Sequence, residues 1–383
     1  MILAGLLAGY IVKKIGLPAL LGMLLAGIAM GPAAFNLVDE RIMPLAADLR
    51  LAALTVILCR AGLALDLRQL KKVGRPALLM CAVPALMELT AVTVIAPHLL
   101  NISYLEAGIL GTVLAAVSPA VVVPRMLKLM QENLGTGKSI PQMIMAAASV
   151  DDVLVIVIFS SLVSAAQSGG GVELKSVLLV PLAVMTGVAV GLAGGWILAY
   201  YFKKFHMRDS VKVLILLSAA FLFMAVEKRS FIPFSGLLAI MFTGIGILKF
   251  HADLAGRLSR KFEKIWVLAE VLLFVLVGMA VDVRYAVAAG LIMLLVIFLA
   301  LIFRMLGVGL CLIKTPLNGK ERLFCMFAYL PKATVQAAIG AIPLALNLPC
   351  GKLVLTAAVL SILFTAPLGA WLIDVSCRKL LDH

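Results

Sequence analysis

The sequence predicts an all-α membrane protein, a bundle of about thirteen transmembrane helices built from two inverted six-helix repeats, with two broken helices that cross. Three observations lead to this fold class. Hydrophobic residues make up 63% of the 383 residues and charged residues only 14%, and the mean hydropathy is +1.15. Apolar segments of bilayer length follow one another along the whole chain, and a short motif recurs late in it. Such a composition excludes an ordinary soluble globular protein.

Charged or Pro- and Gly-rich breaks separate segments of about 20 apolar residues, the length that crosses a bilayer as a helix. The predicted spans cover residues 1–13, 17–36, 46–66, 74–100, 104–127, 138–167, 175–203, 210–227, 231–249, 262–282, 285–314, 321–349 and 352–376. The first span is short and lacks the basic start and cleavage site of a signal peptide, so we interpret it as a short or truncated helix. No long polar region interrupts the series, which predicts a single membrane domain over residues 1–383.

The basic residues between the spans predict the orientation. If successive loops alternate sides, 23 Lys and Arg residues lie on one side and 7 on the other. The positive-inside rule places the richer side in the cytoplasm. The amino terminus is then outside and the carboxy terminus inside, which requires an odd number of spans. A basic cytoplasmic face also accounts for the net charge of +14, so nucleic acid is not an expected partner.

Cysteine and histidine do not indicate a metal or a redox site. The six Cys occur singly in apolar segments without the spacing of metal ligands, so we interpret them as packing residues. The four His lie at span ends, in loops or at the terminus, unsuited to a shared site. The sequence also lacks HExxH and similar catalytic motifs. We therefore expect no cofactor and no enzymatic activity.

An internal repeat relates the two halves of the chain. The motif GLALDLR at 62–68 matches GMAVDVR at 278–284, and the loop charges give the two copies opposite directions. Glu88 and Arg304 each lie 26 residues after the first glycine of their copy. An acid and a base at equivalent positions of inverted repeats can meet across the pseudo-two-fold axis. The sequence therefore predicts a buried ion pair between Glu88 and Arg304.

The repeat also predicts the organisation of the domain. The two repeats cover roughly residues 1–167 and 210–376, and the helix at 175–203 links them. This arrangement, with substrate bound near the middle of the membrane, is typical of secondary transporters.

Proline residues interrupt one span in each repeat. The stretch LAAVSPAVVVP (114–124) places Pro119 in mid-span, and LPKATVQAAIGAIP (330–343) begins with Pro331. Proline removes a backbone donor and frees carbonyls at membrane depth. Two interrupted spans at corresponding positions indicate a transporter's substrate site. Lys332, beside the second break, stabilises half-helix carbonyl ends in one interpretation and has only a local structural role in the other.

Two adjacent acids lie in the apolar stretch MAAASVDDVLVI (145–156), namely Asp151 and Asp152. Ionisable groups inside a membrane protein usually face a partner or a water-filled cavity, so the alternative to a functional site is a set of structural ion pairs. Carboxylate oxygens with Ser118 and freed carbonyls suit a partly dehydrated Na⁺ or Li⁺. Burial and the neighbouring acid favour the protonated form, so protons compete with the cation and the two acids titrate as a pair.

The three motifs LAAVSPAVVVP, MAAASVDDVLVI and LPKATVQAAIG, in this order and spacing, resemble the NHA branch of the cation/proton antiporter superfamily, the sodium/proton exchangers. The resemblance runs from LPALLGMLLAG to LFTAPLGAWL. It implies a homodimer with a dimerisation domain and a six-helix core domain that moves in an elevator-like alternation. It also implies that Asp152 is the main ion and proton carrier and that Asp151 is its neighbour in the pair.

The resemblance further implies that Arg304, paired with Glu88, stands where the electrogenic relatives have a lysine, which leaves the stoichiometry open. Animal members have a longer amino-terminal region, so we expect a minimal prokaryotic version in the plasma (inner) membrane. The predicted function is alternating-access sodium(lithium)/proton antiport. The alternatives are potassium/proton antiport, or a channel or organic-anion symporter of similar fold.

Overall fold

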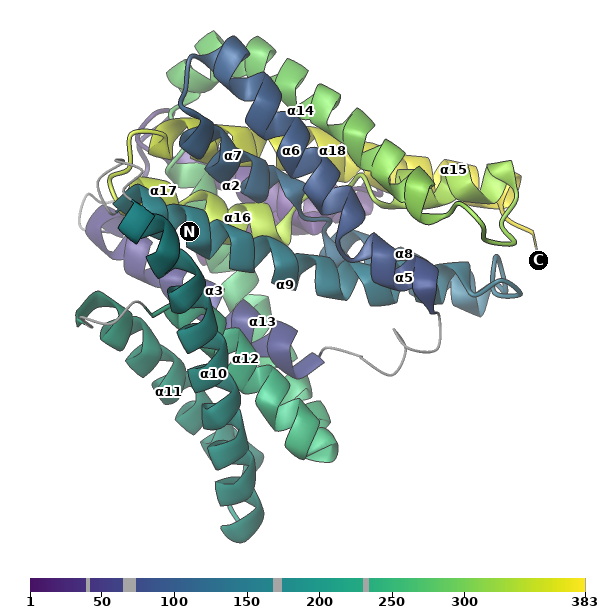
Figure 1. Cartoon of the computed structure of the whole chain (residues 1–383). Coiled ribbons are helices and arrows are strands. Elements are labelled where there is room, and N and C mark those ends of the chain that lie inside the picture. The colour runs from purple at the N-terminus through teal and green to yellow at the C-terminus, as the bar shows by residue number, and fades with distance from the viewer. Residues whose placement is uncertain (39–41, 65–73, 168–173, 230–233, 383) are drawn as a thin grey trace. The chain divides into compact units, whose positions relative to one another are not determined.

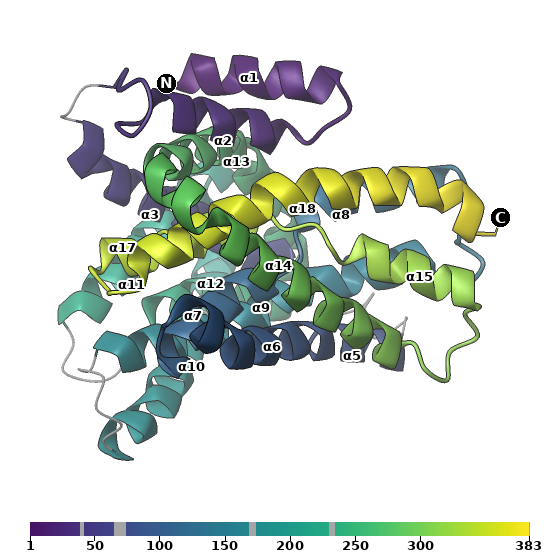
Figure 2. The same ribbon diagram turned by 90° about the horizontal axis from the view of Figure 1, so that it is seen from above.

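The computed structural model describes residues 1–38, 42–64, 74–167, 174–229 and 234–382, and every regular element among them is a helix (Figures 1 and 2). Seven helical stretches of these residues are long and apolar enough to cross a membrane: Arg75–Leu100, Tyr104–Gln131, Ile140–Gln167, Leu182–Lys204, Asp209–Glu227, Val283–Cys311 and Gly351–Leu380. Shorter apolar helices cover Ala19–Met30, Gly236–Phe250 and Thr334–Ala345. The all-α, multi-span class is confirmed, and the total of thirteen spans stays a prediction.

The chain forms two compact units. The first contains Met1–Met43, Asp66–Val155 and Phe274–His383, and the second Pro44–Leu65 and Ile156–Leu273. The helices wholly in the first unit are α1 (Ile2–Lys14), α2 (Ala19–Met30), α5 (Arg75–Met80), α6 (Val83–Leu100), α7 (Tyr104–Ala115), α8 (Pro119–Gln131), α14 (Val283–Cys311), α15 (Gly319–Ala328), α16 (Thr334–Gly340), α17 (Ile342–Ala345) and α18 (Gly351–Leu380). The helices wholly in the second are α10 (Leu174–Lys204), α11 (Asp209–Arg229) and α12 (Gly236–Phe250), whereas α3 (Ile42–Ala64), α9 (Ile140–Gln167) and α13 (Ala252–Met279) have residues in both. The predicted repeats and linker helix stay predictions.

In the first unit, α6 packs against α7 and α14, and α18 packs against α14, α15, α16 and α17 (Figures 1 and 2). The crossing of α14 and α6 depends on Gly307, because a Cβ there would lie 2.8 Å from the Cα of Pro84. Small residues allow such close helix crossings in membrane proteins, where no hydrophobic effect drives helices together. This crossing brings the buried part of α14 next to α6.

Both predicted helix breaks are present in the first unit. Helix α7 ends at Ala115 and α8 begins at Pro119, and the flanking residues Ala116 and Ser118 have extended backbone. Helix α15 ends at Ala328 and α16 begins at Thr334. The two breaks touch, because the Ser118 N–H donates to the Pro331 carbonyl over 2.8 Å. Backbone groups that the prolines release from helical bonding thus pair across the crossing.

In the second unit, α10 packs closely along α12. Gly187, Gly191 and Gly195 are four residues apart, so they lie on one face of α10. A Cβ at Gly191 would lie 2.6 Å from the Ala239 carbonyl oxygen, and the other two approach α12 as closely. This face of α10 therefore requires glycine.

We expect Gly191→Ala to destabilise the protein by about 1–3 kcal/mol, because the new methyl group meets backbone that cannot move aside. Gly256→Ala in α13 is the matched control, since that glycine is exposed and a Cβ added there would have no neighbouring atom within 4 Å. The control should melt at or slightly above the wild-type temperature, because alanine favours the helix. Thermal melting in detergent tests both variants. Equal melting temperatures would contradict the close approach.

Candidate functional site

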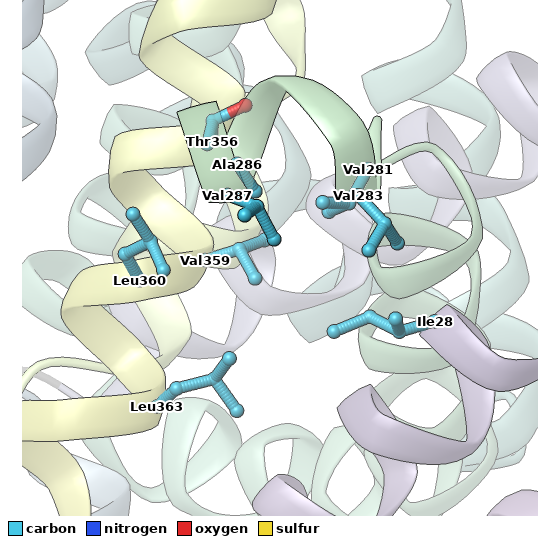
Figure 3. Close-up of a pocket in the computed structure, with 9 residues that line it drawn as sticks. All are labelled: Ile28, Val281, Val283, Ala286, Val287, Thr356, Val359, Leu360 and Leu363. Carbon is cyan, nitrogen blue, oxygen red and sulfur yellow. The ribbon is translucent and has the colours of Figure 1, made fainter. Parts of the chain in front are cut away.

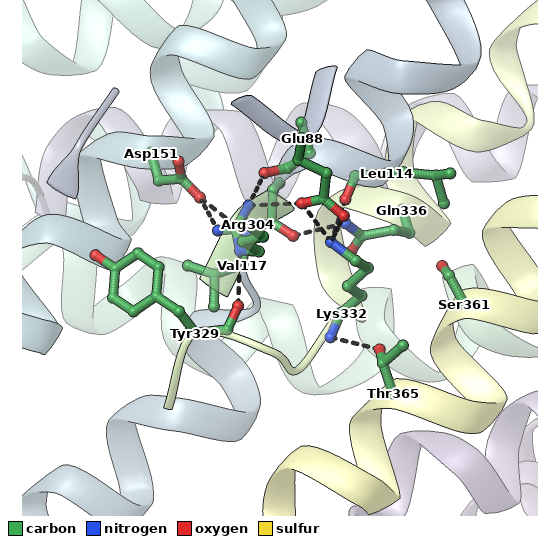
Figure 4. A network of polar contacts seen from close by, with 12 residues as sticks. Glu88, Leu114, Val117, Asp151, Arg304, Tyr329, Lys332, Gln336, Ser361 and Thr365 are labelled. Carbon is green, nitrogen blue, oxygen red and sulfur yellow. Dashed lines mark hydrogen bonds and ion pairs between the residues drawn. The ribbon is translucent and has the colours of Figure 1, made fainter. Parts of the chain in front are cut away.

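The centre of the first unit is the side chain of Arg304, which is fully buried on α14. Its Nη1 donates to Glu88 Oε2 over 2.9 Å and to the Ala115 carbonyl, and its Nη2 donates to Asp151 Oδ2 over 2.9 Å. Its Nε donates to the Tyr329 carbonyl over 2.7 Å. One guanidinium therefore joins α6, α7, α9 and the end of α15 (Figure 4).

A second buried cation, Lys332, lies in the break between α15 and α16. Its Nζ is 2.7 Å from Glu88 Oε1 and 2.9 Å from Oε2, and it donates to the Leu114 carbonyl. Its backbone N–H donates to Thr365 Oγ1 over 3.0 Å. Glu88 thus binds both cations (Figure 4). The interpretation that Lys332 stabilises half-helix carbonyls matches this contact with the end of α7.

The two acids of the Asp pair have different surroundings. Asp151 is fully buried, and its Oδ2 accepts from Arg304 and, over 2.9 Å, from the Val117 N–H. Asp152 is partly buried and has no salt bridge or hydrogen bond to its carboxylate within the described part of the chain; its Oδ1 is sequestered from solvent. Asp151 is therefore tied to the ion-pair network, and Asp152 is the acid left outside it.

The broken end of α7 is held by side chains from later helices. The carbonyls of residues 114–116 accept, in that order, from Lys332, Arg304 and Gln336. Cationic donors suit a helix C-terminus, where the unpaired carbonyls concentrate partial negative charge. The contact of Gln336 was not predicted from the sequence, although a lone amide in the apolar stretch 334–341 is a visible signal.

Ser118 precedes α8 at the N-cap position, yet its side chain makes no capping hydrogen bond. Ser103 and Ser235, at the same position of α7 and α12, do accept such bonds. The Ser118 Oγ is buried without a protein partner, as are Asp151 Oδ1 and Asp152 Oδ1. Hard cations bind such oxygen atoms. Each of the three predicted cation ligands therefore has one buried oxygen atom without a hydrogen-bond partner in the described structure.

No group of three or more His, Cys, Asp or Glu side chains that could hold a metal ion occurs among the described residues.

Glu88 and Arg304, which hold equivalent positions in the two predicted repeats, form an ion pair in the structure. The structure adds two partners that the sequence did not indicate. Arg304 also binds Asp151, and its guanidinium carbon lies 5.4 Å from the centre of the Tyr329 ring, within the range of a cation–π interaction. Tyr329 is fully buried. Asp66 and Arg68 of the first repeat motif lie outside the described residues.

Two cavities of the first unit have mainly apolar linings that include none of the four charged residues of this network. One of about 200 Å³ lies between α2, α14 and α18, with Ile28, Val287 and Leu360 in its wall (Figure 3). Another of about 480 Å³ runs along α6 beside Phe303. Each has a single threonine in its lining, Thr356 or Thr90, whereas a bound cation needs several oxygen ligands.

Comparison with known proteins agrees on one family. A family model described as "Sodium/hydrogen exchanger, transmembrane" matches residues 2–374. Sodium/hydrogen exchanger 9B2 from Homo sapiens is 35% identical over 390 residues, covering 96% of this chain and 70% of that protein. Sodium/hydrogen exchanger 9B1 from Macaca fascicularis is 33% identical over 382 residues, covering 95% and 73%.

The fold is also that of a solved structure. The sodium proton antiporter MjNhaP1 from Methanocaldococcus jannaschii superposes with a TM-score of 0.82 over 100% of this chain and 97% of that one, at 22% sequence identity. At this identity the likeness concerns the fold alone.

We expect Arg304→Ala to lower the melting temperature strongly, because breaking a buried ion pair on one side costs about 3–5 kcal/mol. Asp151 then has no cation bonded to it, whereas Glu88 keeps Lys332. Adding Asp151→Asn should therefore recover much of the loss, since it removes the stranded charge. Adding Glu88→Gln should not, because it strands Lys332 as well. Melting in detergent distinguishes the two double variants, and equal losses would show that Arg304 does not balance Asp151.

Proposed function

Since this chain belongs to the transmembrane sodium/hydrogen exchanger family, we propose that it exchanges Na⁺ or Li⁺ for H⁺ by alternating access, with cation and proton competing for Asp152. Membership in the family makes the chain a multi-pass membrane transporter of the sodium/proton antiport type, a class distinct from enzymes. The ion that Asp152 carries, its competition with the proton and the alternation of access are parts of the proposal.

One observation carries the proposal, the charge balance of the buried network. Glu88 and Asp151 bring two negative charges, and Arg304 and Lys332 bring two positive charges, all within bonding distance. These four groups neutralise one another in place. Asp152 is the remaining carboxylate beside them, with no bonded cation in the described structure. A single monovalent cation or a single proton can therefore neutralise it.

The chemistry of exchange follows from this one unbalanced carboxylate. A buried carboxylate without a partner is costly, so Asp152 favours either a bound cation or a bound proton over the empty ionised form. The two ligands use the same oxygens and exclude each other. Suppose that the site is open to one side of the membrane at a time and changes sides only when Asp152 has bound a cation or a proton. Each cation carried in one direction is then matched by a proton carried in the other.

The fixed pairs support a one-for-one exchange. Arg304 and Lys332 contact Glu88 and Asp151 directly, so in this proposal the four groups stay paired while Asp152 alone changes ligand, in place of the joint titration of the two aspartates that the sequence suggested. The site then carries the same total charge with either ligand. We infer that transport is electroneutral, with one Na⁺ or Li⁺ exchanged for one H⁺.

We also propose the orientation that the loop charges indicate, with the amino terminus outside and the carboxy terminus in the cytoplasm. The homodimer and the inner membrane of a prokaryote are proposals that rest on the resemblance to the NHA branch. The carboxy-terminal ends of α8 and α18 support the orientation, because Lys128, Arg378 and Lys379 lie in their last turns. Reporter fusions at the carboxy terminus test the orientation, and cross-linking in membranes tests the dimer.

We expect purified protein in proteoliposomes to release protons from the vesicles when Na⁺ or Li⁺ is added outside. The rate should not change when a membrane potential is imposed with a potassium-selective carrier, because no net charge moves. Empty liposomes are the control. A K⁺ response larger than the Na⁺ response would instead favour potassium/proton exchange, and a strong dependence on the potential would contradict the one-for-one exchange.

We expect Asp152→Asn to abolish cation-dependent proton flux while the protein stays folded, because the amide keeps the shape but neither titrates nor supplies negative charge. Asp151→Asn should reduce the flux less, since it removes a neighbour that is bound to Arg304. Flux across a range of pH, with folding checked by chromatography, measures both. Wild-type flux from Asp152→Asn would contradict the carrier assignment, and equal inactivation would contradict the division of roles.

A further inference from the structure

We propose that Gln336 is a positioning residue for the cation site and that it acts through a single peptide group, the one between Ala116 and Val117. The inference rests on the proposed function. Gln336 lies in the first turn of α16 and is fully buried. Its Nε2 donates to the Ala116 carbonyl over 2.9 Å (Figure 4). The acceptor is the first residue of the break between α7 and α8.

The same peptide group contacts Asp151 at its other edge. The Val117 N–H donates to Asp151 Oδ2 over 2.9 Å. Because a peptide group is planar, its carbonyl and its N–H cannot rotate independently, and in the trans form they point in opposite directions. Gln336 and Asp151 therefore hold one rigid plane from its two sides. A change in the bond of Gln336 must change the bond of Asp151.

The orientation of this peptide plane determines which oxygen of Asp151 is left without a hydrogen-bond partner. Oδ2 is occupied by the Val117 N–H and by Arg304, whereas Oδ1 is buried without a protein partner. Without the amide of Gln336, the Ala116 carbonyl would be a buried acceptor with no partner, which is costly. Rotation of the plane to give that carbonyl another partner would withdraw the N–H from Asp151 Oδ2, and Asp151 would lose the orientation that leaves Oδ1 free for the cation. Gln336 opposes this rotation.

The chemistry of Gln336 itself favours positioning over general stabilisation. Its Oε1 is buried and has no donor in the described part of the chain. The hydrogen bond from Nε2 to the Ala116 carbonyl is therefore the one polar contact that the buried amide makes there. The other two carbonyls at the end of α7 are held by charged groups. A neutral donor at the third position holds the carbonyl without altering the charge balance on which one-for-one exchange depends.

The test compares Gln336→Met with wild type in proteoliposomes, by measuring proton flux against Na⁺ concentration at fixed pH. Methionine has similar size but cannot donate. We expect the apparent KM for Na⁺ to rise about fivefold to tenfold, the effect of one lost buried hydrogen bond. The maximal rate should stay close to wild type, because the proton needs only the carboxylate of Asp152. The ratio of Li⁺ to Na⁺ affinity should also change.

Gln142→Met is the matched control, because Gln142 on α9 also has a buried Oε1 without a partner among the described residues, and its side chain makes no hydrogen bond to the break. It should keep the wild-type KM. Thermal stabilisation by added Na⁺ in detergent is the second readout and reports binding without transport. Weaker stabilisation in Gln336→Met than in Gln142→Met is expected.

The outcomes separate this inference from the proposed function. Wild-type protein without Na⁺-dependent proton flux would overturn the proposed function. Active wild type with an unchanged KM and unchanged Na⁺ stabilisation in Gln336→Met would overturn the inference alone. If the Met variant does not fold, Gln336→Asn replaces it, since its amide is one methylene too short to reach. An unchanged KM in that variant, or unfolding of both variants beside a folded control, would also overturn the inference.

Discussion

A guanidinium group at full burial costs several kcal/mol unless its donors are bonded and its charge is balanced. Arg304 meets both conditions through four hydrogen bonds, two to carboxylates and two to backbone carbonyls. Each acceptor comes from a different part of the chain. The positions of Glu88, Asp151 and the end of α7 are consequently set by one side chain, and the rest of the site is arranged around it.

The broken helices make this centre possible. A continuous α7 would use the carbonyls of residues 114–116 in its own hydrogen bonds, and none would be left for the buried cations. Because the helix stops before Pro119, these carbonyls can accept from Lys332, Arg304 and Gln336. The second break places the carbonyl of Pro331 against the first. Irregular backbone within the membrane is thus stabilised by protein groups instead of water.

The contrast between the two aspartates follows from the same network. Asp151 and Asp152 are adjacent in an apolar helix, and adjacent residues of a helix point in directions about 100° apart. One side chain therefore reaches Arg304 while the other does not. In the proposed function, a structural acid and a carrier acid stand side by side for this reason. The first is bonded to a cationic side chain, and the second has no bonded cation in the described structure.

The sequence alone predicts those features of the fold and the site that depend on residue type and local sequence. The membrane class, the positions of the breaks at Pro119 and Pro331 and the cost of two buried acids follow from composition, proline chemistry and hydropathy alone. The pairing of Glu88 with Arg304 could also be predicted, from their equal spacing in the two copies of the predicted repeat.

The tertiary structure alone decided the partners of Asp151, the second bond of Glu88 and the contact of Gln336. Asp151 and Arg304 are 153 residues apart, and Gln336 and Ala116 are 220 apart, with no repeat that relates them. Residue type and hydropathy treat Asp151 and Asp152 alike, since both are acids in the same apolar stretch, and only the resemblance to a known family distinguished them in the sequence. The rotation of α9 about its own axis, set by packing, determines which carboxylate faces the guanidinium and which has no bonded cation.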